Sequence, residues 1–309
     1  MVRSCKPRQF RSFAIDHFAD RLLAAAATKG APVCVGLDPV YERLPAALQR
    51  DGGDVAGRVA AIRTFCEGVL EAVAEHVPCV KIQAACFERY RGPGFEAMFD
   101  LIRMAKRLGL LVILDAKRGD IGTSSAHYAA GLLADPDGAD ALTVNAYLGA
   151  DGLEPFTEAA AAGGKGLFAL VRTSNPGGDA IQGLPLQDGR TVGEAVADVV
   201  ADLGSRPDYV GEKGYSLLGA VVGATKPADA KSLRDRMGQQ LFLVPGFGAQ
   251  GGTADDVRAC FKPDGTGALI TASRSVLYAY EQVEGADWQA AVADAARALN
   301  GQIAAILHA

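Results

Sequence analysis

The sequence predicts a single-domain α/β protein, a (β/α)8 (TIM) barrel with an extra N-terminal helix and inserted loops. Three observations lead to this fold class. Eight short apolar runs recur along the chain, segments with helical periodicity lie between them, and each run is continuously apolar rather than alternating. Continuous hydrophobicity is typical of parallel strands that are covered on both faces. Right-handed strand–helix–strand crossovers then close eight such strands into a barrel within about 250 residues.

Each predicted element is an apolar run or an amphipathic segment. The strands are expected at residues 33–37, 79–83, 111–115, 141–145, 167–173, 217–223, 241–247 and 269–273. Spaced apolar residues with charges between them predict helices at 55–74, 95–108, 193–203, 228–237 and 288–307, and another before the first strand at 16–27. The turn-rich stretches 175–189 and 204–214 are expected to be long loops or insertions.

No domain boundary is evident, so residues 1–309 are expected to form one domain. It would comprise an N-terminal extension with its helix over 1–30, the eight strands over about 31–275, and a C-terminal helical segment over 276–309.

The composition indicates a soluble protein whose partner is a small molecule. Of the 309 residues, 49% are hydrophobic and 22% are charged, and the net charge of -5 argues against nucleic-acid binding. No apolar segment reaches the roughly 18 residues of a membrane span, and residues 1–13 lack a signal-peptide core, so we expect a cytoplasmic protein. The six cysteines form no CxxC pair, which favours a reducing compartment and disfavours a thiolate metal site.

The most informative segment is the end of the third predicted strand. The apolar run of residues 110–114 ends in Asp115, Lys117 and Asp120. Side chains two apart on a strand point the same way, so Asp115 and Lys117 are expected to project together while Ala116 points behind them. One interpretation is a structural salt bridge. Because burying ions costs several kcal/mol each unless partners compensate, this concentration of charge favours a functional site.

Polar residues also end most of the other predicted strands, where a barrel of this type carries its chemistry. The seventh strand is followed by the glycine-rich run 246–252, and the eighth by Arg274. Loops at these two places commonly bind phosphate through backbone N–H groups, and an arginine adds a fixed cation. Glycines alone also fit a tight, flexible turn, but Arg274 in the next loop favours a site for a phosphorylated substrate.

The ordered set of motifs resembles the orotidine 5'-phosphate decarboxylase family, in the longer bacterial subgroup often called type 2. The resemblance covers most of the chain, although the Asp-x-Lys-x-x-Asp core alone is shared by a wider suprafamily. The matching segments are 35–39 (VGLDP), Lys81, 115–122 (DAKRGDIG), 143–149 (TVNAYLG), 154–156 (EPF), 172–177 (RTSNPG), 222–225 (VGAT) and 245–252 (PGFGAQGG). The resemblance implies conversion of orotidine 5'-monophosphate to uridine 5'-monophosphate and CO2, the last step of UMP synthesis, without a metal or organic cofactor.

The chemistry of this reaction suggests roles for the charged residues. Loss of CO2 from C6 of a pyrimidine leaves a carbanion that the ring delocalises poorly, so fixed charge must stabilise it. Lys117 is expected to stabilise this carbanion and then protonate it. Asp115 would hold Lys117 and lie near the departing carboxylate, and Asp120 would complete an alternating array with Lys81. The resemblance implies that Asp120 enters the site of a neighbouring subunit, so we expect an obligate homodimer with shared sites.

The resemblance also implies substrate-binding residues by matching position. They are Asp38 and Lys81 for the ribose, Ser174 for the pyrimidine edge, Gln250 between the base and the phosphate, and Arg274 for the phosphate with Ser273 beside it. Ser124 takes the place of a ribose-contacting hydroxyl, with the adjacent Thr123 as an alternative. Segments 174–178 and 247–252 have the glycine content of loops that close over a substrate.

Three other functions remain open from the sequence. A metal-dependent sugar-phosphate lyase or aldolase would need more carboxylates at the barrel mouth than Glu88 alone. A Schiff-base aldolase would use Lys81 or Lys117, but flanking aspartates favour the charged form of a lysine over the nucleophilic one. A nucleotide-binding barrel that has lost its activity is the third alternative.

Overall fold

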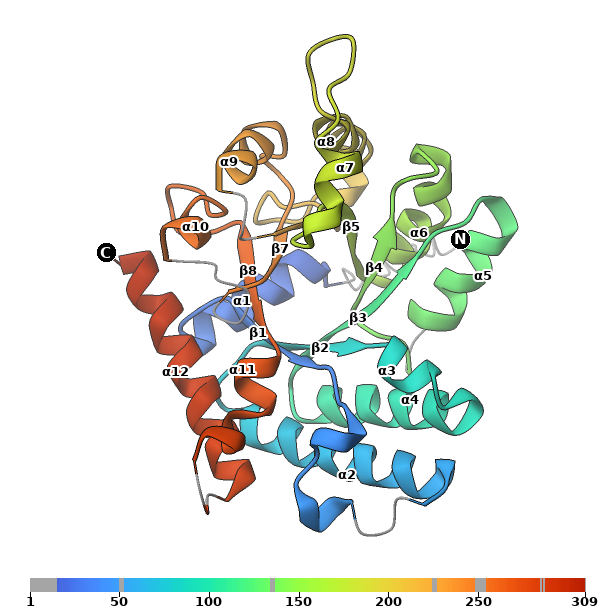
Figure 1. The fold of residues 1–309 in the computed structure, drawn as a ribbon. Coiled ribbons are helices and arrows are strands. Elements are labelled where there is room, and N and C mark those ends of the chain that lie inside the picture. The colour runs from blue at the N-terminus through green and yellow to red at the C-terminus, as the bar shows by residue number, and fades with distance from the viewer. Residues whose placement is uncertain are drawn as a thin grey trace, which may run out of the picture.

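Eight parallel strands close into a barrel in chain order, as the sequence predicts (Figure 1). The computed structural model describes residues 16–49, 53–133, 137–223, 227–247, 254–283, 285 and 287–308. Each strand pairs with the next, and the last pairs with the first. The strands are β1 (Val33–Leu37), β2 (Cys79–Gln83), β3 (Leu111–Arg118), β4 (Ala141–Asn145), β5 (Gly166–Arg172), β6 (Leu218–Val222), β7 (Phe242–Pro245) and β8 (Ala268–Ala272).

The strand boundaries agree with the predicted ones to within one residue, except at the ends of two strands. Strand β3 continues three residues beyond Asp115, through Lys117 to Arg118, and its pairing with β4 is irregular between Leu114 and Arg118. Strand β7 ends at Pro245, two residues before the predicted end, so Gly246 and Phe247 belong to the loop that follows.

Helices surround the barrel, and all six predicted helices are present (Figure 1). The described helices are α1 (Phe18–Lys29), α2 (Val55–Val73), α3 (Ala85–Glu88), α4 (Arg91–Arg107), α5 (Gly122–Leu133), α6 (Ala150–Gly163), α7 (Asp179–Gln182), α8 (Val192–Gly204), α9 (Pro227–Arg236), α10 (Ala254–Arg258), α11 (Arg274–Leu277) and α12 (Trp288–His308). The patterns above do not single out α5 and α6. Both contain glycine within the helix, and α6 also contains Pro155, and these residues disfavour a helix interior.

The two stretches predicted to be long loops are ordered by short elements. The first contains a 3-10 turn over Pro176–Gly178, helix α7, and a bridge between Pro185 and Thr191. The second contains a 3-10 turn over Pro207–Tyr209 and a bridge between Val210 and Ser216. Both stretches therefore contain short ordered elements besides their turns.

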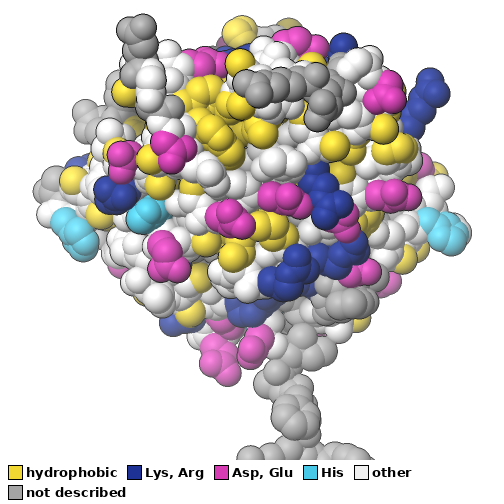
Figure 2. Space-filling model, turned by 90° about the horizontal axis from the view of Figure 1, so that it is seen from below, with side chains coloured by type: hydrophobic (Ala, Val, Ile, Leu, Met, Phe, Trp, Pro, Cys, Tyr) yellow, Lys and Arg dark blue, Asp and Glu magenta, His cyan; other side chains and the backbone are white. Residues whose placement is uncertain are grey.

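Acidic and basic side chains are intermixed on the face seen from below (Figure 2). Ion pairs also join two helices, because Arg63 of α2 contacts Glu67 on its own helix at 2.8 Å and Asp100 of α4 at 2.6 Å. None of the helices in the described part of the chain combines the length and apolar character needed to cross a membrane.

Helix α1 lies against the amino-terminal ends of the strands, opposite the end where the strands carry polar residues (Figure 1). The ring of Phe18 is fully buried and meets Phe168 of β5 edge to face, with 6.0 Å between centroids. Gly166 makes this approach possible, because a Cβ there would lie 2.1 Å from Cδ1 of Phe18. The predicted extra helix therefore completes the core inside the barrel.

We expect Phe18→Ala to lower the free energy of unfolding by about 3–5 kcal/mol, because it removes a buried ring and leaves a cavity at the end of the barrel. Urea unfolding would measure the change. The control is Phe95→Ala, since Phe95 is an exposed phenylalanine on α4 and its removal should change stability by about 0.5 kcal/mol or less. Equal losses in the two variants would show that α1 does not contribute through Phe18.

Candidate functional site

The carboxyl ends of β1, β2 and β3 bring together a cluster of alternating positive and negative side chains. Asp38 follows β1, Lys81 lies on β2, and Asp115 and Lys117 lie on β3. Lys81 Nζ lies 3.3 Å from Asp38 Oδ1 and 2.9 Å from Asp115 Oδ2, and Lys117 Nζ lies 2.6 Å from Asp115 Oδ1. The structure confirms that Asp115 and Lys117 project together from β3.

Asp115 is the centre of this cluster. Its side chain is only 9% exposed, and each of its oxygens receives a lysine. Oδ2 also accepts a hydrogen bond from Gln83 Nε2 at 3.1 Å, and Oδ1 accepts one from the Thr143 hydroxyl at 2.9 Å. Burial alone would raise the pKa of this carboxyl, but the two lysine charges and their hydrogen bonds outweigh burial and lower its pKa to about 2. Asp115 is therefore a fixed anion at any physiological pH.

Lys81 is the buried cation of the cluster, with a side chain only 8% exposed. Burial alone would lower its pKa, but the carboxylates of Asp38 and Asp115 outweigh burial and raise the pKa above its usual value. A lysine held in the ammonium form is a poor Schiff-base nucleophile. This disfavours the Schiff-base alternative at Lys81.

Lys117 differs from Lys81 in two ways. Its side chain is 46% exposed, so the ammonium reaches open space while still touching Asp115. Its backbone has a φ of 49°, in the left-handed region that a residue with a side chain rarely adopts. Such a conformation costs on the order of 1–3 kcal/mol and persists only where the surrounding structure enforces it.

Two adjoining cavities, each of about 170 Å³, open beside the charged cluster. They share Lys81, Asp115, Pro245 and Thr271 in their walls. The first cavity is also lined by Lys117, Thr143 and Ser174, and the second by Asp38, Gln83, Ser273 and Arg274. Seven of the sequence-predicted site residues thus surround one continuous depression: Asp38, Lys81, Asp115, Lys117, Ser174, Ser273 and Arg274.

Two predicted residues line neither cavity, and a third is not among the described residues. Asp120 lies in the turn before α5, is partly exposed, and accepts a hydrogen bond from the Ile121 N–H at 2.8 Å. Ser124 and its alternative Thr123 are both exposed on α5 and line neither cavity. Gln250, with most of the loop 247–252, lies outside the described residues.

Other polar residues in the walls were not assigned a role from the sequence. Gln83 and Thr143 both bond to Asp115. Thr271 on β8 has a buried hydroxyl with no hydrogen-bond partner in the described structure, and it lines both cavities. Their position near the carboxyl ends of strands could have indicated a role in the site. Neutral side chains are common at such positions, however, so position alone does not identify them.

A glycine in the first motif is required by close packing at the site. A Cβ on Gly36 of β1 would lie 2.0 Å from Ser273 Oγ and 3.3 Å from Asp38 Oδ1. Any larger residue would therefore push Ser273 or Asp38 away from the second cavity.

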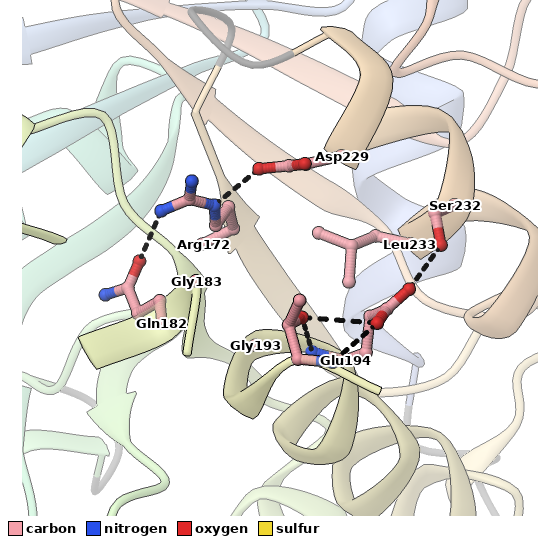
Figure 3. Close-up of a pocket in the computed structure, with 9 residues that line it drawn as sticks. Arg172, Gln182, Gly183, Gly193, Glu194, Asp229, Ser232 and Leu233 are labelled. Atoms are coloured by element: carbon pink, nitrogen blue, oxygen red, sulfur yellow. Dashed lines mark hydrogen bonds and ion pairs between the residues drawn. The ribbon is translucent and has the colours of Figure 1, made fainter. Parts of the chain in front are cut away.

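Arg172, at the end of β5, holds the loop that carries Ser174 (Figure 3). Its Nε donates to Asp229 of α9 at 2.7 Å and its Nη2 donates to Asp179 of α7 at 2.5 Å. Gln182 also holds this loop, because its Oε1 accepts a hydrogen bond from the backbone N–H of Thr173 at 2.9 Å. Arg172, Gln182 and Asp229 also line a separate cavity of about 180 Å³. The position of Ser174 therefore depends on a buried arginine two residues before it.

The metal-dependent alternative relied on Glu88 as a ligand. The Glu88 carboxylate instead forms an ion pair with Arg118. Within the ranges given above, no three His, Cys, Asp or Glu side chains converge so that they could hold a metal ion. The charged cluster pairs carboxylates with lysines, and ammonium groups do not ligate metals.

Comparison with known proteins identifies similar chains. Residues 31–287 match the family model described as Orotidine 5'-phosphate decarboxylase / HUMPS family. The orotidine 5'-phosphate decarboxylase of Rhodopirellula baltica is 44% identical over 93% of this chain and 98% of its own length. That of Deinococcus radiodurans is 43% identical over 89% of this chain and 94% of its own. The structure of Leishmania donovani OMP decarboxylase superposes with a TM-score of 0.76 at 32% identity, covering 95% of this chain and 100% of that one.

Proposed function

The chain belongs to the orotidine 5'-phosphate decarboxylase family and converts orotidine 5'-monophosphate to uridine 5'-monophosphate and CO2 in pyrimidine biosynthesis, and we propose that Lys117 performs the chemical step. The observation that carries this proposal is the position of the Lys117 ammonium. It lies 2.6 Å from Asp115 and reaches the open cavity, whereas Lys81 is buried between two carboxylates.

In the proposed mechanism the C6–carboxylate bond breaks and its electron pair stays on C6. The fixed positive charge of Lys117 beside C6 stabilises this carbanion without reorganisation, because Asp115 already holds the ammonium. Lys117 Nζ then gives a proton to C6, which completes UMP, and the neutral amine regains a proton from solvent. The role of Lys81 is electrostatic, since it offsets the charge of Asp115 in the buried part of the site.

The two cavities suggest how the substrate lies. Ser174 shares the first cavity with Lys117, so we place the pyrimidine there. Arg274 and Ser273 line the second cavity, so we place the phosphate there. Asp38 and Lys81 lie where the ribose would join the two. We keep Gln250 as an expected contact between base and phosphate, and Thr271 is a further candidate for a contact because its hydroxyl lacks a partner in the described structure.

We also propose a homodimer in which Asp120 completes the site of the partner subunit. The support is an apolar patch beside Asp120, formed by Ile121, Tyr147 and Leu148, of which Tyr147 is 82% exposed. The patch is continuous with the Asp120 turn, because a Cβ on Gly152 would lie 3.1 Å from the Asp120 carbonyl oxygen and 3.2 Å from Leu148 Cβ. Large exposed apolar side chains of this kind are typical of subunit interfaces. A second copy would cover the patch and receive Asp120.

The proposed location is the cytoplasm. The five described cysteines, Cys34, Cys66, Cys79, Cys86 and Cys260, are all free thiols, which supports a reducing compartment.

The test of the function follows the loss of orotidine 5'-monophosphate absorbance with purified protein, with and without a chelator. We expect rapid loss that the chelator does not change. No loss with a folded protein would overturn the decarboxylase assignment, and loss only with added metal would favour the metal-dependent alternative.

The shared site is tested by mixing two inactive variants, Lys117→Ala and Asp120→Asn. In a mixed dimer, one of the two sites has both native residues, so random exchange of subunits should restore about a quarter of wild-type activity. Each variant alone and a mixture that has not exchanged serve as controls. If the mixture stays inactive although size analysis shows mixed dimers, Asp120 does not act across the interface.

A further inference from the structure

Thr143 occupies the place where the pairing of β3 with β4 is irregular. Leu114 pairs with Leu142 and Arg118 pairs with Val144, so four steps along β3 are matched by only two along β4. The extra β3 residues form a bulge that contains Lys117, and such bulges often redirect a functional side chain. Thr143 lies between the two β4 partners, and its side chain is buried.

The Thr143 hydroxyl makes two hydrogen bonds to this bulge. Its Oγ1 accepts the backbone N–H of Lys117 at 2.9 Å and donates to Asp115 Oδ1 at 2.9 Å. The same Asp115 oxygen receives the Lys117 ammonium at 2.6 Å. The backbone of Lys117, the Thr143 hydroxyl, the Asp115 carboxylate and the Lys117 ammonium therefore form a closed ring of interactions.

This ring explains why Lys117 keeps a φ of 49°. Without the bond from its N–H to Thr143, the backbone of the bulge would be free to relax toward the extended region that a lysine prefers. Relaxation would move the base of the Lys117 side chain and the Asp115 oxygen that orients it. The residues placed at the pyrimidine edge and the phosphate lie on other elements. At the ribose, Lys81 contacts the other Asp115 oxygen, Oδ2, and is also held by Asp38.

We propose that Thr143 is a positioning residue for decarboxylation, whose hydroxyl holds Lys117 in its left-handed conformation and orients the Asp115 oxygen that receives its ammonium. The inference rests on the proposed role of Lys117. It assigns Thr143 an effect on the chemical step and little effect on substrate binding.

The test compares Thr143→Val, which keeps the shape and removes the hydroxyl, with Thr143→Ser, which keeps the hydroxyl. We expect Thr143→Val to lower kcat by about 100-fold with KM changed by less than about threefold, since a displacement near 1 Å at a reacting group has an effect of this size. Thr143→Ser should stay within about fivefold of wild-type kcat. Thr157→Val is the matched control, because Thr157 is also fully buried and its hydroxyl bonds to the Glu154 carbonyl in α6, away from the site.

Two results would overturn the proposal: a Thr143→Val protein that keeps more than about a third of wild-type kcat, or equal losses of kcat in Thr143→Val and Thr143→Ser. If Thr143→Val does not fold, Thr143→Cys replaces it, because a thiol of similar size is a weak donor and acceptor, and it should be clearly slower than Thr143→Ser. Lys117→Ala is measured in parallel. If Lys117→Ala is inactive and Thr143→Val is fully active, only the role of Thr143 fails, whereas an active Lys117→Ala overturns the role of Lys117 and this inference with it.

Discussion

Replacing Lys117 by alanine should lower kcat at least about 10⁴-fold, because general-acid proton transfer contributes about 10²–10⁴ and a preorganised electrostatic contact about 10²–10³. The variant loses both effects at once, since the same ammonium stabilises the carbanion and supplies its proton. The fold should persist, because the Lys117 side chain is half-exposed and Lys81 still compensates Asp115. Steady-state decarboxylation of orotidine 5'-monophosphate, with circular dichroism to confirm folding, measures the effect.

Lys213→Ala is the control for this variant. Lys213 is an exposed lysine in the turn before β6, and its backbone N–H bonds to Asp20 of α1 at the opposite end of the barrel. Its side chain should be irrelevant to turnover. Lys117→Arg should also be nearly inactive, since guanidinium holds its proton too tightly to act as an acid and its planar shape differs from that of an ammonium. A folded Lys117→Ala protein that keeps more than about a tenth of wild-type kcat would place the proton donor elsewhere.

The second large effect is expected for Asp115→Ala, which should lower the free energy of unfolding by about 3–5 kcal/mol and abolish turnover. The loss of stability arises because Lys81 is buried and would keep only Asp38, at 3.3 Å, as its counter-ion. Removing one member of a buried ion pair is far more destabilising than removing both. We therefore expect the double variant Lys81→Met with Asp115→Asn to regain at least half of the lost stability while remaining inactive.

Urea unfolding of the single and double variants at neutral pH tests this expectation. If the double variant is no more stable than Asp115→Ala, the buried charges stabilise the fold in their own right. If it is more stable but inactive, the charges are retained for chemistry at the expense of stability.

The pH dependence of stability has a defined sign at Asp115. The pKa of Asp115 is about 2 in the folded protein, against the ordinary value of 3.8 that applies to the unfolded chain. Ionised Asp115 therefore stabilises the fold above pH 4. About 2 kcal/mol of this stability is lost as the pH falls from about 4 to about 2. The stability difference between wild type and Asp115→Asn should narrow over that window. Urea midpoints measured at steps below pH 4 would show this, and a constant difference would contradict the lowered pKa.

Much of the barrel was predictable because it depends on local hydrophobicity. All eight strands were found, since a parallel strand covered on both faces must be apolar along its whole length. Helices α5 and α6 were not singled out, because glycine within both helices and Pro155 in α6 weaken the local preference for a helix. Most of the site was also predictable, because Asp38, Lys81, Asp115, Lys117 and Arg274 are charged residues at strand ends, where burial without function is costly.

The sequence by itself determined the barrel, the charged cluster and the family, because hydrophobic runs and the order of charged motifs are written along the chain. Only the tertiary structure decided which other groups hold the charged residues and the site loops in place. The Thr143 hydroxyl, the left-handed backbone of Lys117 and the hold of Arg172 on the Ser174 loop all depend on contacts between distant segments. A bulge is defined by two strands together, and a hydrogen bond by two atoms brought within about 3 Å, so neither can be seen in one segment alone.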